Sequence, residues 1–204
     1  MGKIVVFGGS FNPPTRAHYE LGLKALEFLD GDRLCFVPVG DKYSKDGLIE
    51  SKHRVNMLNL LCDNHNNECV DVDLTEVNAQ GNLNTINTLR ILGEKYNNAT
   101  LYFLLGADNL LHLTEWHKAE EILRDYKILA IKRDGYSIKD IIKHKGLLTK
   151  YKDNIIEVDI KEEMMISSTM VRKMIVSKDE SVIRYINENV NKYIQENNLY
   201  KYIK

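Results

Sequence analysis

The residues from Gly8 to His18, GGSFNPPTRAH, have the composition of a turn that binds an anion. Two adjacent glycines let the backbone pass close to a ligand, and a helix that begins after the turn offers N–H groups and a positive dipole end to a phosphate. Thr15 and His18 are three residues apart, so their side chains share one face of the first helical turn. A histidine there can donate a hydrogen bond to a phosphate oxygen whose charge grows during a reaction. The alternative is a histidine that a nearby carbonyl satisfies.

Residues 166–172, ISSTMVR, form a second candidate anion site. Either Ser167 or Ser168 is a suitable N-cap, so a helix is predicted to begin here. Arg172 lies one helical turn beyond Ser168 on the same face. Two hydroxyls, a helix N-terminus and a guanidinium group together predict a cradle for a polyphosphate. The alternative is an ordinary capped helix with an arginine that faces solvent.

The elements that position these turns alternate between strands and helices. Short apolar runs predict strands at residues 3–7, 34–38, 70–74, 101–105, 128–131 and 155–158. Helical periodicity predicts helices at 17–29, from Ser51 onward with Ser51 as N-cap, around 86–92, and near the C-terminus with a stripe of Ile183, Ile186, Val190, Tyr193 and Ile194. The alternation predicts an α/β fold with a mostly parallel sheet. Ligands of such sheets bind beyond the carboxyl ends of the strands, which is where the first turn lies.

Composition narrows the class of protein. The chain has 204 residues, 28 basic and 29 acidic side chains and a formal charge of −1. This length predicts a single domain over residues 1–204, with a helical C-terminal part at about 166–204. The balanced charge argues against a general nucleic-acid binder, and the lack of an apolar run of about 18 residues argues against a membrane helix. Three cysteines without a Cys-x-x-Cys pair predict a cytoplasmic protein with neither a disulfide framework nor a zinc site.

Both turns carry a family resemblance. The first, with Thr15-x-x-His18, resembles the (His/Thr)-x-x-His signature of the nucleotidyltransferase superfamily and, more narrowly, the nicotinate/nicotinamide mononucleotide adenylyltransferases. Residues 166–172 match the Ile-Ser-Ser-Thr-x-x-Arg motif with which that family holds the phosphates of ATP. The resemblance implies a Rossmann-like nucleotidyltransferase fold with helices on both faces of the sheet and a helical C-terminal extension. Many bacterial members have His where this chain has Thr15.

Two further segments resemble the parts of the family that bind the mononucleotide. Residues 38–48 are similar to a loop that carries a lysine for the mononucleotide phosphate, which by position is Lys45. Thr85 falls where bacterial members have Thr-x-Asp-Thr-Leu, although Asn87 stands here in place of the aspartate. The alternatives are a solvated charged loop for Lys45 and the start of a packed helix for Thr85.

A third segment resembles the family's Gly-x-Asp…Trp pattern. It comprises Gly106 and Asp108, then Trp116 and His117. The resemblance implies that Asp108 accepts hydrogen bonds from the ribose or amine groups of ATP and that Trp116 stacks on the pyridine ring. Trp116 as a core residue is the alternative. Arg133 belongs to a fourth segment of resemblance, whose role stays open.

The implied enzyme transfers AMP from ATP to nicotinate mononucleotide and releases pyrophosphate. The catalytic residues are then His18 and Arg172. The ATP-binding residues are Gly8, Gly9, Ser10, Phe11, Thr15, His18, Gly106, Asp108, Ser168, Thr169 and Arg172. The mononucleotide-binding residues are Ser10, Asn12, Lys45, Thr85, Trp116 and His117. No protein metal ligands are implied, and Mg²⁺ is held mainly by the substrate phosphates.

Other functions stay open at this point. Nicotinamide mononucleotide is an alternative acceptor, alone or together with the nicotinate form, and phosphopantetheine or a cytidylyl substrate is a more distant one. A nucleotide sensor without catalytic activity would bind ligand without releasing pyrophosphate. A Rossmann oxidoreductase requires the Gly-x-Gly-x-x-Gly that the first turn lacks. The implied partners are ATP and a pyridine mononucleotide, with no nucleic acid and no membrane; an oligomer stays open.

Overall fold

The computed structural model describes residues 2–63, 68–132, 135, 137–159 and 166–201. Its strands are β1 (Gly2–Gly9), β2 (Arg33–Pro38), β3 (Val70–Val72), β4 (Ala99–Gly106), β5 (Lys127–Ile131) and β6 (Ile155–Val158). They form one six-stranded sheet in the order β3-β2-β1-β4-β5-β6. The pairings β1–β4, β4–β5 and β5–β6 are parallel. The predicted α/β fold with a parallel sheet is therefore confirmed.

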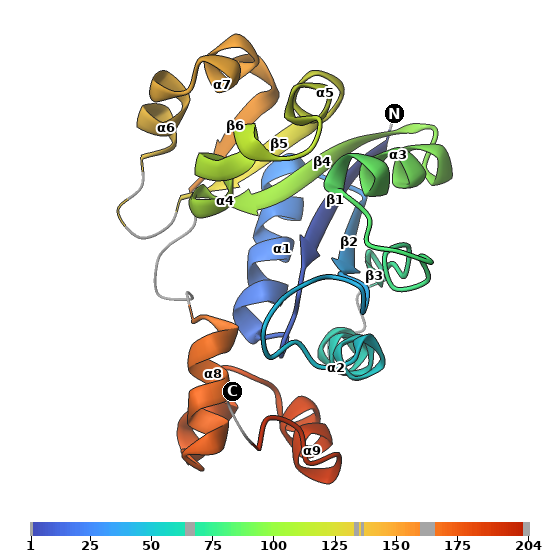
Figure 1. The fold of residues 1–204 in the computed structure, drawn as a ribbon, viewed down its shortest axis with the longest axis vertical. Helices are drawn as coiled ribbons and strands as arrows, with labels where there is room; N and C mark the ends of the chain where they lie inside the picture. Colours follow the sequence, from blue (N-terminus) through green and yellow to red (C-terminus); the bar gives the residue numbers. More distant parts are fainter. Residues whose placement is uncertain (1, 64–67, 133–134, 136, 160–165, 202–204) are drawn as a thin grey trace. The chain divides into compact units, whose positions relative to one another are not determined.

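Helices separate the strands along the chain, as Figure 1 shows. They are α1 (Arg16–Leu29), α2 (Ser51–Asp63), α3 (Thr85–Lys95), α4 (Ala107–His112), α5 (Ala119–Asp125), α6 (Ile138–His144), α7 (Gly146–Lys150), α8 (Ser168–Val176) and α9 (Glu188–Glu196). Short 3₁₀ turns lie at η1 (Leu113–Glu115), η2 (Lys152–Asn154) and η4 (Glu180–Arg184). Within the described ranges no helix has the length and apolar character needed to cross a membrane.

The strands carry the core, because parallel strands are covered on both faces and read as continuous apolar runs. Val5 in β1 is completely buried, and so are Leu129 and Ala130 in β5. Strand β1 is in register with β4 through Val5 and Tyr102. Strand β1 ends at Gly9, so the first turn begins at this end of the strand.

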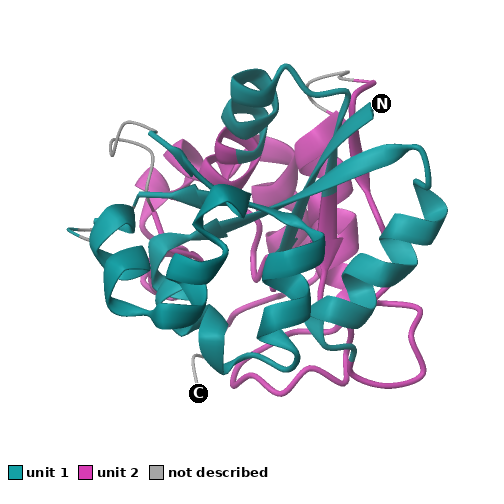
Figure 2. Ribbon diagram, turned by 90° about the horizontal axis from the view of Figure 1, so that it is seen from above, with its two compact units in different colours: residues 1–8, 22–35, 83–162 teal, residues 9–21, 36–82, 163–204 magenta. Residues whose placement is uncertain are grey.

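The chain divides into two compact units, coloured separately in Figure 2. The first comprises residues 1–8, 22–35 and 83–162, and the second comprises residues 9–21, 36–82 and 163–204. Neither unit is one continuous stretch, since each takes residues from both halves of the sequence. Apart from Gly8, both predicted anion-binding turns belong to the second unit. The single-domain interpretation stays a prediction.

The C-terminal helix differs from its prediction. The expected continuous stripe is split between η4 and α9, and Ile183 is 47% exposed. The break occurs at Asn187, a buried residue whose side chain accepts a hydrogen bond from the Val190 N–H and donates one to the Leu60 carbonyl. An asparagine that caps a new helix must leave the preceding one, so the prediction of a single helix was wrong.

The start of α2 also differs from its prediction. Ser51 is the first helical residue rather than a side-chain cap. Its N–H and its hydroxyl both donate to the carboxylate of Asp41, at 2.5 and 2.8 Å. A carboxylate from the preceding loop therefore accepts from the first N–H of the helix, where the helix dipole favours negative charge. This contact ties α2 to the loop at residues 40–50.

Candidate functional site

The first turn is compact and buried. Phe11 is 1% exposed and has a φ of 45°, in the left-handed region that an aromatic residue adopts at a cost of about 1 kcal/mol. Its ring packs edge-on against the rings of His18 and Phe36, with centroids 5.2 and 5.6 Å apart. A Cβ on Gly9 would lie 3.1 Å from the Phe11 ring, so only glycine fits there without movement. The surrounding packing therefore holds the turn in one shape.

Thr15 and His18 interact as the three-residue spacing predicts. The Thr15 N–H donates to Nδ1 of His18 at 3.0 Å, and the Thr15 hydroxyl lies 2.7 Å from the same nitrogen. Because a backbone N–H can only donate, Nδ1 must be the acceptor, and the ring proton of neutral His18 is assigned to Nε2. The structure thus orients the imidazole and makes Nε2 its hydrogen-bond donor.

Arg54 of α2 binds the first turn and the segments next to it through a buried guanidinium. Its side chain is 0% exposed, and its guanidinium donates to the carbonyls of Ser10, Val39 and Ile49 at 3.1, 2.7 and 2.9 Å. Burial lowers the pKa of Arg54, and the Asp41 carboxylate 3.6 Å away opposes that shift. A buried arginine is costly unless its donors are paired, and here each of its three nitrogens donates to a carbonyl. Arg54 therefore joins the turn, the end of β2 and the loop at 40–50.

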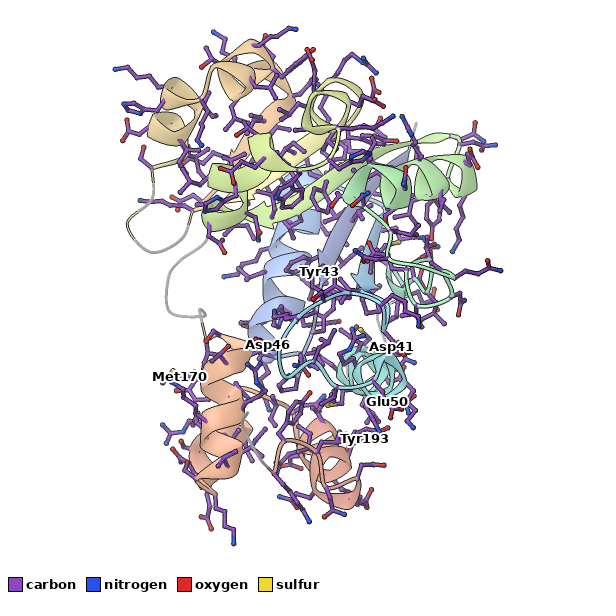
Figure 3. All side chains as sticks on the ribbon, viewed as in Figure 1. Asp41, Tyr43, Asp46, Glu50, Met170 and Tyr193 are labelled. Carbon is purple, nitrogen blue, oxygen red and sulfur yellow. The ribbon has the colours of Figure 1, made fainter. Side chains whose placement is uncertain are left out.

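The loop at residues 40–50 brings a second cation to the turn. Lys45 donates to the hydroxyl of Ser10 at 3.0 Å. Burial lowers the pKa of Lys45, and the positive charges of Arg172 and Arg54 lower it further. Figure 3 shows this loop through its labelled Asp41, Tyr43, Asp46 and Glu50. The loop begins at Gly40, where a Cβ would come within 2.4 Å of the Glu76 carbonyl oxygen.

The second turn lies against the first. Of the two candidate caps, Ser167 is the one that accepts from the Met170 N–H, while the Ser168 hydroxyl donates to the Pro13 carbonyl at 2.8 Å. Arg172 donates to the Asn12 carbonyl at 2.8 Å and to the Thr169 hydroxyl at 3.2 Å. The structure thus brings the two motifs together, although about 150 residues of chain separate them.

The combined turn is rich in positive charge. Three cations interact with it directly, Lys45, Arg54 and Arg172, and the nearby carboxylate of Asp41 is bound by Ser51 and Arg54. Burial raises the pKa of Asp41, but the hydrogen bonds from Ser51 and the charge of Arg54 outweigh it and lower the pKa overall. No group of three His, Cys, Asp or Glu side chains that could hold a metal occurs in the part of the chain that the structure describes. This donor set suits phosphate oxygens.

The remaining predicted site residues lie in the first unit. Gly106 ends β4, and Asp108 is exposed in the first turn of α4. Trp116 is half-buried, with its ring edge-on to Phe103 at 6.2 Å, and His117 is exposed.

Three further sequence predictions concern residues outside that segment. Thr85 is the half-buried first residue of α3. A Cβ on Gly8 would meet the Phe103 ring at 3.5 Å. Arg133, whose role the sequence left open, lies outside the described residues.

Sequence reasoning missed two residues that contact the first turn. Arg54 follows the segment that resembles the family's lysine-bearing loop, but it was assigned no role. Its spacing on one helix face with the buried Met57, Leu58 and Leu61 is the signal that could have shown its burial. Tyr200, in the C-terminal segment, donates to the side chain of Asn12 at 2.9 Å. No local pattern in the sequence indicates that contact.

The chain is similar in sequence to proteins of one enzyme family. A family model described as cytidylyltransferase-like matches residues 6–174. The nicotinate-nucleotide adenylyltransferase of Bacillus subtilis (strain 168) is 30% identical over 203 residues, which cover 98% of this chain and 100% of that protein. A probable nicotinate-nucleotide adenylyltransferase of Acholeplasma laidlawii is 32% identical over 202 residues, covering 98% and 99%.

A solved structure has the same fold. It is the nicotinic acid mononucleotide adenylyltransferase of Plasmodium falciparum complexed with NaAD, which matches with a TM-score of 0.81 and 24% identity over 98% of each chain. At this level of identity the likeness concerns the fold.

Proposed function

Because the chain belongs to the nicotinate-nucleotide adenylyltransferases within the cytidylyltransferase-like family, we propose that it transfers AMP from ATP to nicotinate mononucleotide. The phosphate of the mononucleotide attacks the α-phosphorus of ATP. A new P–O bond forms, the bond between the α-phosphorus and the bridging oxygen breaks, and pyrophosphate leaves with the electron pair. The products are nicotinate adenine dinucleotide and pyrophosphate.

The Thr15–His18 interaction is the observation that carries this proposal. In-line transfer needs positioning and charge stabilisation rather than a protein nucleophile. A neutral imidazole with its proton on Nε2 donates one oriented hydrogen bond to an oxygen that becomes more negative in the transition state. Thr15 fixes the tautomer and the ring orientation, and it aligns the triphosphate beside the N-terminus of α1.

The cations around the turn divide between the two substrates. Lys45 and Ser10 take the phosphate of the mononucleotide, because Nζ of Lys45 lies 3.0 Å from the Ser10 hydroxyl and one phosphate can reach both groups. Arg172, with Ser168 and Thr169, takes the α- and β-phosphates of ATP. Arginine has five N–H donors, so the bonds of Arg172 to Asn12 and Thr169 leave it further donors for phosphate oxygens. Gly8, Gly9 and Phe11 shape the backbone that approaches the triphosphate.

The residues of the first unit are proposed to bind the nucleoside parts. Gly106 and Asp108 bind the adenosine of ATP, and Trp116 stacks its half-buried ring on the pyridine. Thr85 and His117 bind the carboxylate of the pyridine ring.

A divalent metal ion, which we propose to be Mg²⁺, would be held by the substrate phosphates and water. The cationic and neutral donors at the turn suit anionic oxygens rather than a protein cage for a cation. When bound, the ion neutralises phosphate charge. The protein's own contribution is the orientation of the phosphates by His18, Lys45 and Arg172.

Pyrophosphate release tests the proposal. Purified protein is incubated with ATP, Mg²⁺ and nicotinate mononucleotide, and in parallel with nicotinamide mononucleotide or with no acceptor. We expect release with the nicotinate form at least tenfold faster than without acceptor, together with formation of the dinucleotide. Binding of ATP without release from any acceptor would instead identify a nucleotide sensor.

A further inference from the structure

The C-terminal segment places one tyrosine hydroxyl inside the site. Tyr200 follows α9, is 7% exposed and has a φ of 60°. Its hydroxyl donates to Oδ1 of Asn12 at 2.9 Å. Burial raises the pKa of Tyr200, although Arg172 and Arg54 oppose the shift, so the hydroxyl stays protonated and remains a donor. A buried tyrosine normally finds a partner for its hydroxyl, and here the partner belongs to the first turn.

Asn12 also binds two other parts of the site, the loop at residues 40–50 and Arg172. Its side chain is 0% exposed. Nδ2 donates to the Gly47 carbonyl at 2.8 Å, and Oδ1 also accepts from the Ile49 N–H at 3.5 Å. The Asn12 backbone carbonyl accepts from Arg172. The amide is therefore used in positioning the loop at 40–50, and a role as a direct mononucleotide ligand would require it to release these bonds.

The loop needs such an anchor because it carries Lys45 toward charges of the same sign. Arg172 and Arg54 disfavour the positive charge of Lys45 as long as no phosphate lies between them. Asn12 holds the loop just beyond Lys45, because its side chain donates to the Gly47 carbonyl and accepts from the Ile49 N–H. The Gly47 carbonyl, which can only accept, and the Ile49 N–H, which can only donate, fix which way the Asn12 amide faces. The Tyr200 hydroxyl stabilises that orientation by donating to Oδ1.

We propose that Tyr200 is a positioning residue of the adenylyl transfer, acting through Asn12 to hold the loop that carries Lys45. The inference rests on the proposed function for its kinetic consequence. It assigns to the C-terminal segment a role in mononucleotide binding, without contact between Tyr200 and substrate.

Tyr200→Phe is the test variant, and Tyr193→Phe is its matched control. Tyr193 belongs to α9 of the same C-terminal segment, and its hydroxyl also bridges side chains, accepting from Asn56 at 2.9 Å and lying 2.9 Å from Nδ1 of His53. Both substitutions remove one hydrogen-bonded hydroxyl and keep the ring. We expect Tyr200→Phe to raise KM for nicotinate mononucleotide about three- to tenfold, with KM for ATP changed less than twofold, and Tyr193→Phe to change neither.

A double-mutant cycle separates positioning from general stability. If Tyr200 acts through the loop, Tyr200→Phe has less than a twofold effect on KM for the mononucleotide when Lys45 is already Ala. An unchanged effect in the Lys45→Ala background overturns the proposal, as does an equal loss in Tyr193→Phe.

Hydrogen exchange tests the same contact without catalysis. In Tyr200→Phe we expect amides of residues 42–50 to exchange about tenfold faster than in the parent protein, and those of α9 to be unchanged. This result would stand even if no acceptor released pyrophosphate, in which case the proposed function fails and the structural coupling holds. Equal exchange in the parent and the variant overturns the coupling whatever the activity.

Discussion

The two anion-binding turns are built in different ways. The first, at residues 9–15, is mostly buried, and it is held by Arg54, whose guanidinium donates to three backbone carbonyls. The second, at 166–172, has exposed residues in Ser167, Thr169 and Met170, and it is fastened by side chains to the carbonyls of Pro13 and Asn12. Met170 is labelled on α8 in Figure 3. The first turn is thus a framework, and the second is attached to it.

The two turns differ in whether the groups that hold the turn in place are also the groups that would bind phosphate. In the first turn, Arg54 binds backbone carbonyls, which are not among the groups that we expect to bind phosphate. In the second, the groups that would bind phosphate also make the structural bonds, so that Arg172 must serve Asn12 and a phosphate together. Loss of a framework contact should therefore damage the fold, and loss of an attachment contact should damage binding.

Arg54→Met tests whether contacts that hold the first turn support the fold, and it should have the largest effect. The substitution leaves three inward carbonyls without their donor, so we expect the free energy of unfolding to fall by about 3 kcal/mol. Urea unfolding followed by circular dichroism measures it. Lys52→Met, an exposed change on the same helix, is the control and should stay within about 0.5 kcal/mol. A loss below about 1 kcal/mol for Arg54→Met would mean that the turn does not depend on this brace.

His18→Ala should have the second-largest effect, which we expect on the rate of transfer rather than on stability. We expect kcat to fall about 100-fold or more, because one oriented donor to the transition state is lost, while the melting temperature changes by less than about 3 °C. His18→Gln restores an N–H donor and should recover part of the loss. Steady-state pyrophosphate release measures both variants, and a folded His18→Ala protein with parental kcat would remove His18 from catalysis.

Arg172→Ala tests the attached turn. We expect KM for ATP to rise about tenfold with a smaller change in KM for the mononucleotide, since one charge-assisted phosphate contact is lost. Lys173→Ala, on the exposed side of the same helix, serves as the control and should leave ATP dependence unchanged. An unaltered KM for ATP in Arg172→Ala would contradict the assignment of the second turn to ATP.

Raising the pH should give the smallest effect. The pKa of Lys45 lies below its ordinary value of 10.5, so its positive charge is lost at a lower pH than that of an ordinary lysine. Affinity for the mononucleotide should fall a few-fold across that alkaline range in the parent and stay level in Lys45→Arg, as isothermal titration would measure. Over the same range the unfolded chain binds more protons than the folded one, so Lys45 makes the fold more stable with rising pH. A parallel decline in both proteins would exclude Lys45 as the group responsible.

Local patterns in the sequence foretold most of the fold. Apolar runs and helical periodicity gave the strands and the long helices because burial of the sheet requires them. One exception was the C-terminal stripe, where Asn187 interrupts a periodicity that continues past it. There one capping side chain outweighed the pattern of apolar residues around it.

The candidate site was foreseeable only in part. The Thr15–His18 pair follows from a spacing of three residues. The bonds from Ser168 to Pro13 and from Arg172 to Asn12 span 155 and 160 residues, and chain geometry alone does not specify them. The buried state of Arg54 depends on carbonyls from three separate segments, which no single stretch of sequence displays.

The dependence of Asn12 on later residues has a consequence during synthesis. Its backbone carbonyl accepts from Arg172, 160 residues downstream, and its side-chain amide oxygen accepts from Tyr200, 188 residues downstream. A nascent chain still attached to the ribosome short of these positions already contains the histidine and the strand before it, but not the groups that complete their surroundings. We therefore expect catalytic competence to appear only after Arg172 and Tyr200 have left the exit tunnel.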